Sequence, residues 1–574
     1  MDQKTVFERN LLALSKYNVE LWTLLSKAGV SGRGPGSGAG NRYSFSESRT
    51  GDPVPVRLDP AGTSKPLHSM VDPRKEAKRL MDSGQGESFL ILLGLGAGYY
   101  AEAALERNDV SRVLVIEYDL IGLAELFGRI DYTGILSDPR FRLLACLEDA
   151  ELNEIILAMY QPVLCGGLRV VPLRSRTSSD GELFSRAAEV ISSAIEKVSA
   201  DYSVQAHFGR RWFSNIIRNL QNLQDTNGNA QPLPSVKRAA ITAAGPSLSL
   251  QIELLREKRS GVFLIATDTS LPCLLHAGIS PDAVISIDCQ HISYYHFMDG
   301  LPKEVPLFLD LASPPLLSSL SEKHRFFSCG HPLTSYVSRL SGDFPELDSS
   351  GGNVSYAAVS LAERLGAEEI ELYGADYSYP KGLSYAKAAY IHSFFAKRAN
   401  RLSPIEAQAS TFLFRTPLEK KIKANSWYYA TRTMDFYREK LEEKSRFMGA
   451  DLVPVEGMGA PIGIKRNEHR ASGPHGKKDT KGVINNGGTA LFNAKDFLSK
   501  YRDGIKNLPK PEKNSSDYLN SLTGENRTVF TTILPLAAYF RRRNPEEDFR
   551  ELFEETRNYC LKALDFPTGA TLLS

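Results

Sequence analysis

The feature that most constrains the fold is a series of short, almost continuously apolar runs between residues 236 and 460. The clearest of these runs occupy residues 239–245, 261–267, 282–288, 305–311 and 369–376. Strands that are buried on both faces have this pattern, whereas strands with one solvent-facing side alternate apolar and polar residues. Stretches with helical periodicity separate the runs, as expected for crossovers between parallel strands. The pattern therefore predicts an open, doubly wound α/β sheet.

Length and composition predict a chain of several domains. With 574 residues the chain is too long for one hydrophobic core. We expect an N-terminal α/β domain with a Rossmann-like unit over residues 1–225, the central α/β domain over 226–462, and a linker followed by a helical domain over 463–574. Polar segments rich in loop-forming residues, at 225–234 and 465–482, predict the two boundaries.

Helical periodicity makes two further predictions for the flanks of these domains. Residues 181–223 have the pattern of one long helix or of two. Residues 427–447 have a helical pattern as well, and the apolar run after them predicts a last strand for the central sheet.

Charge and cysteine content argue against several classes of protein, although local charged patches are compatible with the overall balance. The 69 basic and 67 acidic side chains leave a formal net charge of +2, which provides no overall field for nucleic acid or an anionic membrane. The six cysteines form no CxxC pair and no zinc-finger cluster, as is typical of a reducing compartment. The sequence contains neither a run of about 18 apolar residues nor a signal peptide. We therefore expect a cytoplasmic protein that binds no nucleic acid and has no membrane span.

A glycine-rich turn in the first domain predicts a nucleotide-type loop. Gly94, Gly96 and Gly98 stand between a predicted strand and a predicted helix, and Glu117 ends the next strand. Dinucleotide and S-adenosylmethionine sites use such glycines for close backbone approach and such a carboxylate for ribose hydroxyls. A methyltransferase or dehydrogenase is one interpretation. The other is a Rossmann-like structural unit that binds no ligand.

Polar residues follow the apolar runs of the central domain. Ligands of open α/β sheets bind outside the carboxyl ends of the strands, so residues at these positions are candidate ligand contacts. The candidates after the first three runs are Gly245, Pro246, Ser247, Asp268, Ser270 and Asp288. No GK[ST] follows the glycine, which excludes a kinase-type phosphate loop. For each residue taken singly, a role in a turn or a helix cap remains the alternative.

Residues 349–382 are the most informative stretch. Gly351 and Gly352 predict a flexible turn, and Asn353 and Ser355 open a predicted helix where they could hold phosphate or sugar hydroxyls. The helix leads to a strand that ends in GADYSY, which predicts polar side chains at the mouth of the sheet. Those side chains are Asp376, Tyr377 and Tyr379. His392, which follows this loop, is the best-placed histidine for acid–base work.

The motifs of the central domain, taken in the order in which they occur along the chain, resemble the domain shared by motility accessory factor (Maf) proteins and archaeal MptE-like pterin diphosphokinases. The central block carries GPSL, TDTSL, GISPDAVISID and GGNVSYAAVSLAERLGAEEIELYGADYSYPKG. The first domain also looks like Maf, with LHSMVDPRKEA, LGLGAGYY and VIEYD. The resemblance covers roughly residues 50 to 460. It implies an enzyme that transfers a nonulosonic acid, of the pseudaminic or legionaminic type, from a CMP-sugar donor to Ser or Thr of flagellin.

The central block is also similar to bacterial sialyltransferases, which implies roles for individual residues. Ser350 and Gly351 match the Ser-Gly turn that contacts the nucleotide. Asp376 and Tyr377 match the Asp-Phe part of the strand end, but Ser378 stands where those enzymes have a tyrosine. Tyr379 or Tyr385 would then supply the hydroxyl that helps the leaving phosphate. Tyr385 also stands where many members have a histidine, so the general base is unassigned.

The resemblance implies no tightly bound cofactor and no required metal, because amides and hydroxyls can stabilise a departing CMP phosphate. Two alternatives stay open. One is a pterin diphosphokinase-like enzyme that uses ATP and Mg²⁺. The other is a non-enzymatic flagellin-binding assembly factor that acts through the helical third domain.

Overall fold

The computed structural model describes residues 5–27, 42–58, 64–84, 86–223, 234–341, 344–423, 426–464, 492–511, 518–519, 521–545 and 547–565. The predicted linkers at 225–234 and 465–482 lie, apart from residue 234, outside these ranges. The chain divides into two compact units. Unit 1 comprises Met1–His207, Leu508–Arg527 and Leu534–Thr556, and unit 2 comprises Phe208–Asn507, Thr528–Ile533 and Arg557–Ser574.

Unit 1 contains a parallel sheet of the predicted Rossmann-like kind. Its strand order is β6-β5-β4-β7, with β4 (Glu87–Leu93), β5 (Arg112–Glu117), β6 (Phe141–Ala145) and β7 (Gly167–Pro172). An antiparallel sheet precedes it, formed by β1 (Tyr43–Glu47), β2 (Pro53–Leu58) and β3 (Ser64–Pro66). The helices of this part are α1 (Val6–Tyr17), α2 (Val19–Lys27), α3 (Pro73–Asp82), α4 (Tyr99–Leu105), α5 (Leu120–Arg129), α6 (Thr133–Leu136), α7 (Asp149–Met159), α8 (Pro162–Cys165) and α9 (Arg174–Thr177).

Local sequence signals set the starts of these helices. The Thr5 side chain accepts the backbone N–H of Glu8 at the start of α1, and the Glu8 side chain accepts that of Thr5. At the start of α3, Asp72 accepts the backbone N–H of Lys75, and Pro73 occupies the first turn, where a missing N–H costs nothing.

Unit 2 is built on a seven-stranded, fully parallel sheet with the order β12-β11-β10-β9-β8-β13-β17. The strands are β8 (Arg238–Thr242), β9 (Phe263–Thr267), β10 (Ala283–Ser286), β11 (Leu307–Asp310), β12 (His324–Phe327), β13 (Glu369–Tyr373) and β17 (Asp451–Pro454). The predicted doubly wound α/β fold is confirmed, and each of the five apolar runs contains a strand. The sequence did not predict β12, because its first two residues are polar and half-buried.

The strand order reverses at β8, which lies between β9 and β13. Parallel crossovers are right-handed, so the reversal places α15 (Val354–Arg364) on the opposite face of the sheet from α11 (Leu248–Lys258) and α12 (Leu271–His276). α15 packs on β8, β9 and β10 and forms a common core with α18 (Arg432–Ser445). Chain segments leave β8 and β13 toward opposite faces, and this is the point where open α/β folds bind ligands.

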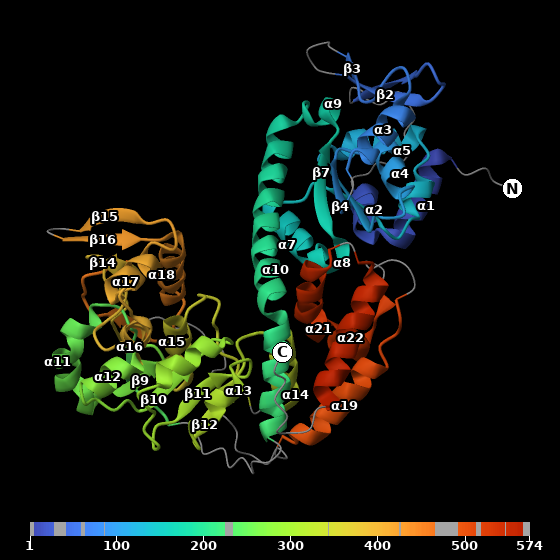
Figure 1. Cartoon of the computed structure of the whole chain (residues 1–574). Coiled ribbons are helices and arrows are strands. Elements are labelled where there is room, and N and C mark those ends of the chain that lie inside the picture. Colours follow the sequence, from blue (N-terminus) through green and yellow to red (C-terminus); the bar gives the residue numbers. More distant parts are fainter. Residues whose placement is uncertain are drawn as a thin grey trace. The chain divides into compact units, whose positions relative to one another are not determined.

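A small antiparallel sheet corrects the prediction of a helix over residues 427–447. Its order is β14-β16-β15, from β14 (Tyr379–Pro380), β15 (Glu419–Lys423) and β16 (Ser426–Ala430). The aromatic sequence of β16 suits a strand, and Thr431 then caps α18 by accepting the backbone N–H of Met434. α16 (Tyr390–Arg398) and α17 (Ile405–Leu413) lie in sequence between β14 and β15 (Figure 1).

The helical predictions for the rest of the chain are confirmed. Residues Gly181–Leu223 form one helix, α10, and the predicted third domain contains α19 (Ala494–Lys506), α21 (Gly524–Arg543) and α22 (Phe549–Asp565). The remaining helices are η1 (Arg259–Gly261), η2 (His291–Phe297), α13 (Pro315–Ser318) and α14 (Pro332–Ser341). Among the helices of the described ranges, none has the length and apolar character needed to cross a membrane.

Candidate functional site

Ser247 and Asp376 meet where the strand order reverses. Asp376 follows β13 and is 4% exposed, and Ser247 directly precedes α11. The Asp376 carboxylate accepts the backbone N–H of Ser247 at 2.8 Å and also its hydroxyl. Ser247 makes no side-chain cap bond to α11, so capping of its own helix, the alternative considered for it, is wrong.

The segment 456–460 completes this arrangement. The Ser247 hydroxyl accepts the backbone N–H of Met458 at 2.7 Å, and the Ser378 hydroxyl accepts that of Ala460 at 2.9 Å. A Cβ at Gly459 would overlap Asp376, so only glycine permits this approach. Burial raises the pKa of Asp376, and its bonds to Ser247 oppose the shift. The polar atoms that were predicted to meet a phosphate are therefore bonded within the chain.

Asp376→Asn is expected to destabilise unit 2. An amide offers one acceptor oxygen where the carboxylate offers two, so one donor of Ser247 would face an NH₂ group. Leaving a buried donor unpaired costs about 1–3 kcal/mol. Urea unfolding followed by circular dichroism measures the loss, and Asp299→Asn, at an exposed position, is the control. An Asp376→Asn variant with an unchanged midpoint and no transferase activity would instead support a direct catalytic role for Asp376.

Ser270 joins the ends of β8 and β9 and is fully buried. Its hydroxyl lies 2.8 Å from the Thr242 hydroxyl and 2.9 Å from the carbonyl oxygens of Thr242 and Thr267. With these bonds satisfied, Ser270 positions the strand ends that carry Gly245 and Asp268. Direct contact between Ser270 and a ligand stays a prediction.

Asp268 is bonded to a histidine that the sequence did not single out as functional. Asp268 Oδ2 lies 3.0 Å from His296 Nδ1 and accepts the Ser286 hydroxyl at 2.7 Å. Asp268 and His296 are 3% and 6% exposed. Among the described residues, none forms a hydrogen bond with His296 Nε2. When Nδ1 carries the proton toward Asp268, the Nε2 lone pair is free to accept another.

Packing between three helical segments places this pair beside a group of aromatic side chains. α16 packs against both η2 and α17. The ring centroid of Tyr390, in α16, lies 4.3 Å from that of His296 and 5.8 Å from that of Tyr385. Burial raises the pKa of Tyr390 and of Tyr385, so both hydroxyls stay protonated, and they are hydrogen-bonded to each other.

Asp288 lies at the same edge of the sheet, after β10. Its Oδ1 accepts the backbone N–H of Gln290 at 2.9 Å. Burial raises the pKa of Asp288, and the nearby carboxylate of Asp268 adds to the shift. The structure thus brings two of the predicted aspartates, Asp268 and Asp288, close to the imidazole of His296.

The turn before α15 is organised by its own chain. Asn353 caps α15 by accepting the backbone N–H of Tyr356 at 3.0 Å, and it accepts the Ser355 hydroxyl at 2.6 Å. A Cβ at Gly351 would overlap the ring of Tyr356, and Gly352 has a positive φ of 73°. Both glycines are therefore required by the turn itself.

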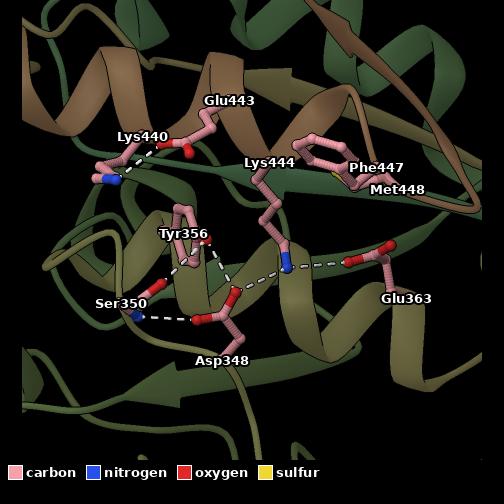
Figure 2. A pocket seen from close by; sticks show the side chains of 9 residues that line it. All are labelled: Asp348, Ser350, Tyr356, Glu363, Lys440, Glu443, Lys444, Phe447 and Met448. Carbon is pink, nitrogen blue, oxygen red and sulfur yellow. Dashed lines mark hydrogen bonds and ion pairs between the residues drawn. The ribbon is translucent and has the colours of Figure 1, made fainter. Parts of the chain in front are cut away.

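Ser350 lies in a cavity of about 300 Å³ between α15 and α18, shown in Figure 2. Asp348 accepts the hydroxyl of Tyr356 at 2.8 Å, and Lys444 lies between Asp348 and Glu363 at 3.2 Å and 3.3 Å. Burial raises the pKa of Asp348, but bonds to Ser350, Tyr356 and Lys444 outweigh this and hold it at about 2. Ser350 thus belongs to a hydrogen-bonded group separate from that of Asp376.

The remaining candidates are dispersed. Tyr377 has a positive φ of 44°, and burial raises its pKa to about 12. Tyr379 is buried in β14, opposite Tyr429. His392 is exposed, and its Nε2 lies 3.2 Å from the carbonyl oxygen of Ala386. His392 therefore has no carboxylate partner among the described residues, unlike His296.

Backbone N–H groups of the glycine-rich turn of unit 1 are hydrogen-bonded to side chains of the same chain. Glu117 accepts the backbone N–H of Leu95 at 2.8 Å, and His68 Nε2 accepts that of Ala97 at 2.9 Å. Burial lowers the pKa of His68 to about 4, so this imidazole is neutral. Arg176, fully buried, pairs with Glu117 at 2.8 Å. The Glu117 carboxylate, which was predicted to bind ribose hydroxyls, is thus bonded to Leu95 and Arg176 instead, and this favours a structural role for the Rossmann-like unit.

The residues that sequence reasoning missed are His296, Ser286 and Tyr390. No known motif has the spacing from Asp268 to His296, and a histidine in a polar stretch is more often a packed or surface residue than a base. Among the described residues, no group of three His, Cys, Asp or Glu side chains could hold a metal ion. The predicted independence from metals stays a prediction.

The chain is similar to known proteins in sequence over part of its length and in fold over most of it. Residues 214–382 match the family model described as 6-hydroxymethylpterin diphosphokinase MptE-like. A solved structure of a Maf glycosyltransferase from Magnetospirillum magneticum AMB-1 is similar over 97% of this chain and 94% of that chain, with a TM-score of 0.54 and 13% identity. At this identity the likeness establishes the fold. The resemblance predicted from the sequence, to Maf proteins with an MptE-like central domain, is confirmed.

Two relatives from Treponema pallidum (strain Nichols) match part of the chain. One uncharacterized protein is 33% identical over 168 residues, which cover 29% of this chain and 80% of the relative. The chain belongs to the family of this protein. A second uncharacterized protein is 32% identical over 152 residues, which cover 26% of this chain and 54% of the relative.

Proposed function

We propose that the chain is a glycosyltransferase that moves a nonulosonic acid, of the pseudaminic or legionaminic type, from a CMP-sugar to Ser or Thr of flagellin. In this way it supports flagellar assembly and motility. The fold shared with a Maf glycosyltransferase supports the reaction class. The observation that carries the proposal is the buried Asp268–His296 pair at the carboxyl edge of the doubly wound sheet. This edge is where such folds bind nucleotides.

His296 would act as the general base of the transfer. The acceptor hydroxyl loses its proton to Nε2 while its oxygen bonds to the anomeric carbon of the donor sugar. The bond between that carbon and the phosphate oxygen breaks, and CMP leaves with the electron pair. Asp268 holds the tautomer with the proton on Nδ1 and stabilises the imidazolium that forms. Asp268 is thus a positioning residue.

The tyrosines near His296 suit the leaving group. Tyr390 and Tyr385 keep their protons because burial raises their pKa values, and their hydroxyls are bonded to each other, which leaves one proton of the pair to donate to a departing phosphate. Tyr385 was among the hydroxyls suggested by the resemblance. Tyr379, the other suggestion, is buried in β14, and we give it no step. We assign no step to His392, because it lacks a carboxylate partner among the described residues.

CMP and CMP-sialic acid are expected to bind the purified protein. Isothermal titration calorimetry should give a saturable heat with a dissociation constant below about 1 mM, the weak end of specific binding. UDP-N-acetylglucosamine is the control ligand, and it should bind at least tenfold more weakly, a difference of about 1.4 kcal/mol. Absence of any heat with CMP or its sugar would remove the basis of the proposal.

A second candidate is favoured by the matched family model, whose description names a pterin diphosphokinase. That reaction would need ATP and Mg²⁺ rather than CMP. A ligand that binds only the native state raises the melting temperature, so thermal shifts with ATP/Mg²⁺ and with CMP separate the two candidates. A shift with ATP/Mg²⁺ alone would favour the kinase.

A further inference from the structure

An exposed arginine lies beside the aromatic group around His296. The guanidinium carbon of Arg415 stacks 3.9 Å from the ring centroid of Phe412, and the side chain is exposed. Arg415 forms no ion pair and no hydrogen bond with any of the described residues. Its charge and its hydrogen-bond donors are therefore directed at solvent, although its stem is held against a ring.

A continuous chain of ring contacts connects Arg415 to the proposed base. The centroid of Phe412 lies 6.1 Å from that of Tyr385, which lies 5.8 Å from that of Tyr390, and His296 follows at 4.3 Å. Burial raises the pKa of Tyr390, and the positive charge of Arg415 opposes that shift, as it does for Tyr385. Arg415 thus acts electrostatically on the hydroxyls of both tyrosines.

We propose that Arg415 and the tyrosines beside it form the binding site for an anionic group of the donor. A guanidinium presents paired N–H donors that match a carboxylate or a phosphate in two-point geometry, and stacking on a ring orients it beforehand. The pair of phenol hydroxyls, bonded to each other, adds one neutral donor. The site therefore takes an anionic sugar nucleotide. This inference rests on the proposed glycosyl transfer and names the residue that selects the charge of the donor.

The chain provides a matched control for the stacking itself. Arg398, in the last turn of α16, stacks on Phe394 at the same 3.9 Å and is also exposed. The ring of Phe394 contacts those of Tyr295 and Phe395, whereas the ring of Phe412 contacts that of Tyr385. Replacing Arg398 removes an equal charge and an equal cation–π contact while leaving the proposed site intact.

The test compares Arg415→Gln and Arg398→Gln by calorimetry. Loss of a charge-assisted contact corresponds to a weakening of about 10- to 100-fold. We expect Arg415→Gln to weaken CMP-sialic acid binding by this factor, and Arg398→Gln to change it less than about twofold. If CMP alone is weakened equally, the phosphate is the group bound. If only CMP-sialic acid is weakened, the carboxylate is bound. Thermal melting confirms that both variants fold.

The outcomes separate this inference from the proposed function. If the unaltered protein binds CMP-sialic acid and Arg415→Gln binds it equally well, the inference fails and the proposed function stands. Equal losses in both variants would also overturn it, since general positive charge would then explain binding. If the unaltered protein binds neither CMP nor its sugar, the proposed function fails and the inference fails with it.

Discussion

His296→Gln is expected to lower kcat for sugar transfer by about two to four orders of magnitude, the usual contribution of a general base. Glutamine keeps a polar group of similar size against Asp268 and Tyr390, but it cannot take a proton from the acceptor hydroxyl. The dissociation constant for CMP should change little. Mass spectrometry of flagellin incubated with a CMP-sugar, with single-turnover rates, measures the loss.

The matched control is His392→Gln, because His392 is exposed and its side chain hydrogen-bonds, among the described residues, with the carbonyl of Ala386 rather than with a carboxylate. This variant should transfer sugar at the unaltered rate. Asp268→Asn provides a second test: an amide can donate to Nδ1 and so favour the tautomer with the proton on Nε2. We expect Asp268→Asn to be slow as well. Full activity of His296→Gln would exclude this residue as the base and return attention to Asp288.

Glu117→Ala is expected to produce the largest loss of stability in unit 1. Arg176 is fully buried, and its partner Glu117 is 2% exposed. Removing one member of a buried ion pair typically costs about 3–5 kcal/mol, because a charge is left uncompensated. The backbone N–H of Leu95 would lose its acceptor as well. We expect the lower part of this range, since Asp180 still binds Arg176. Urea unfolding measures the change.

Glu102→Ala is the control, since Glu102 pairs at 2.7 Å with Arg74, whose side chain is 57% exposed. Exposed pairs contribute about 0–1 kcal/mol, so this variant should melt close to the unaltered protein. If instead the glycine-rich turn binds S-adenosylmethionine through Glu117, that ligand would raise the melting temperature of the unaltered protein. Glu117→Ala would then lose the shift while keeping most of its stability.

The sequence by itself determined the class of both parallel sheets and the position of most of their strands, but not β12 or the strand order. Apolar runs such as 261–267 and 369–376 are typical of strands covered on both faces, and this property is local. The starts of α11 and α15 were also predictable, because glycine, proline and Asn353 act on the adjacent backbone. A pattern that depends on neighbours in sequence needs no knowledge of the rest of the fold.

Only the tertiary structure decided which polar residues meet. Residues 427–430 have a helical pattern, but pairing of Ser426–Ala430 with two other strands makes them part of a sheet. Asp376 was expected to face a ligand, yet Ser247 and the segment 456–460 surround it. The carboxylate that is hydrogen-bonded to His296 belongs to Asp268, 28 residues earlier in the sequence. Such pairs depend on strand order and helix packing, and no local pattern encodes the distance between two side chains that far apart in the chain.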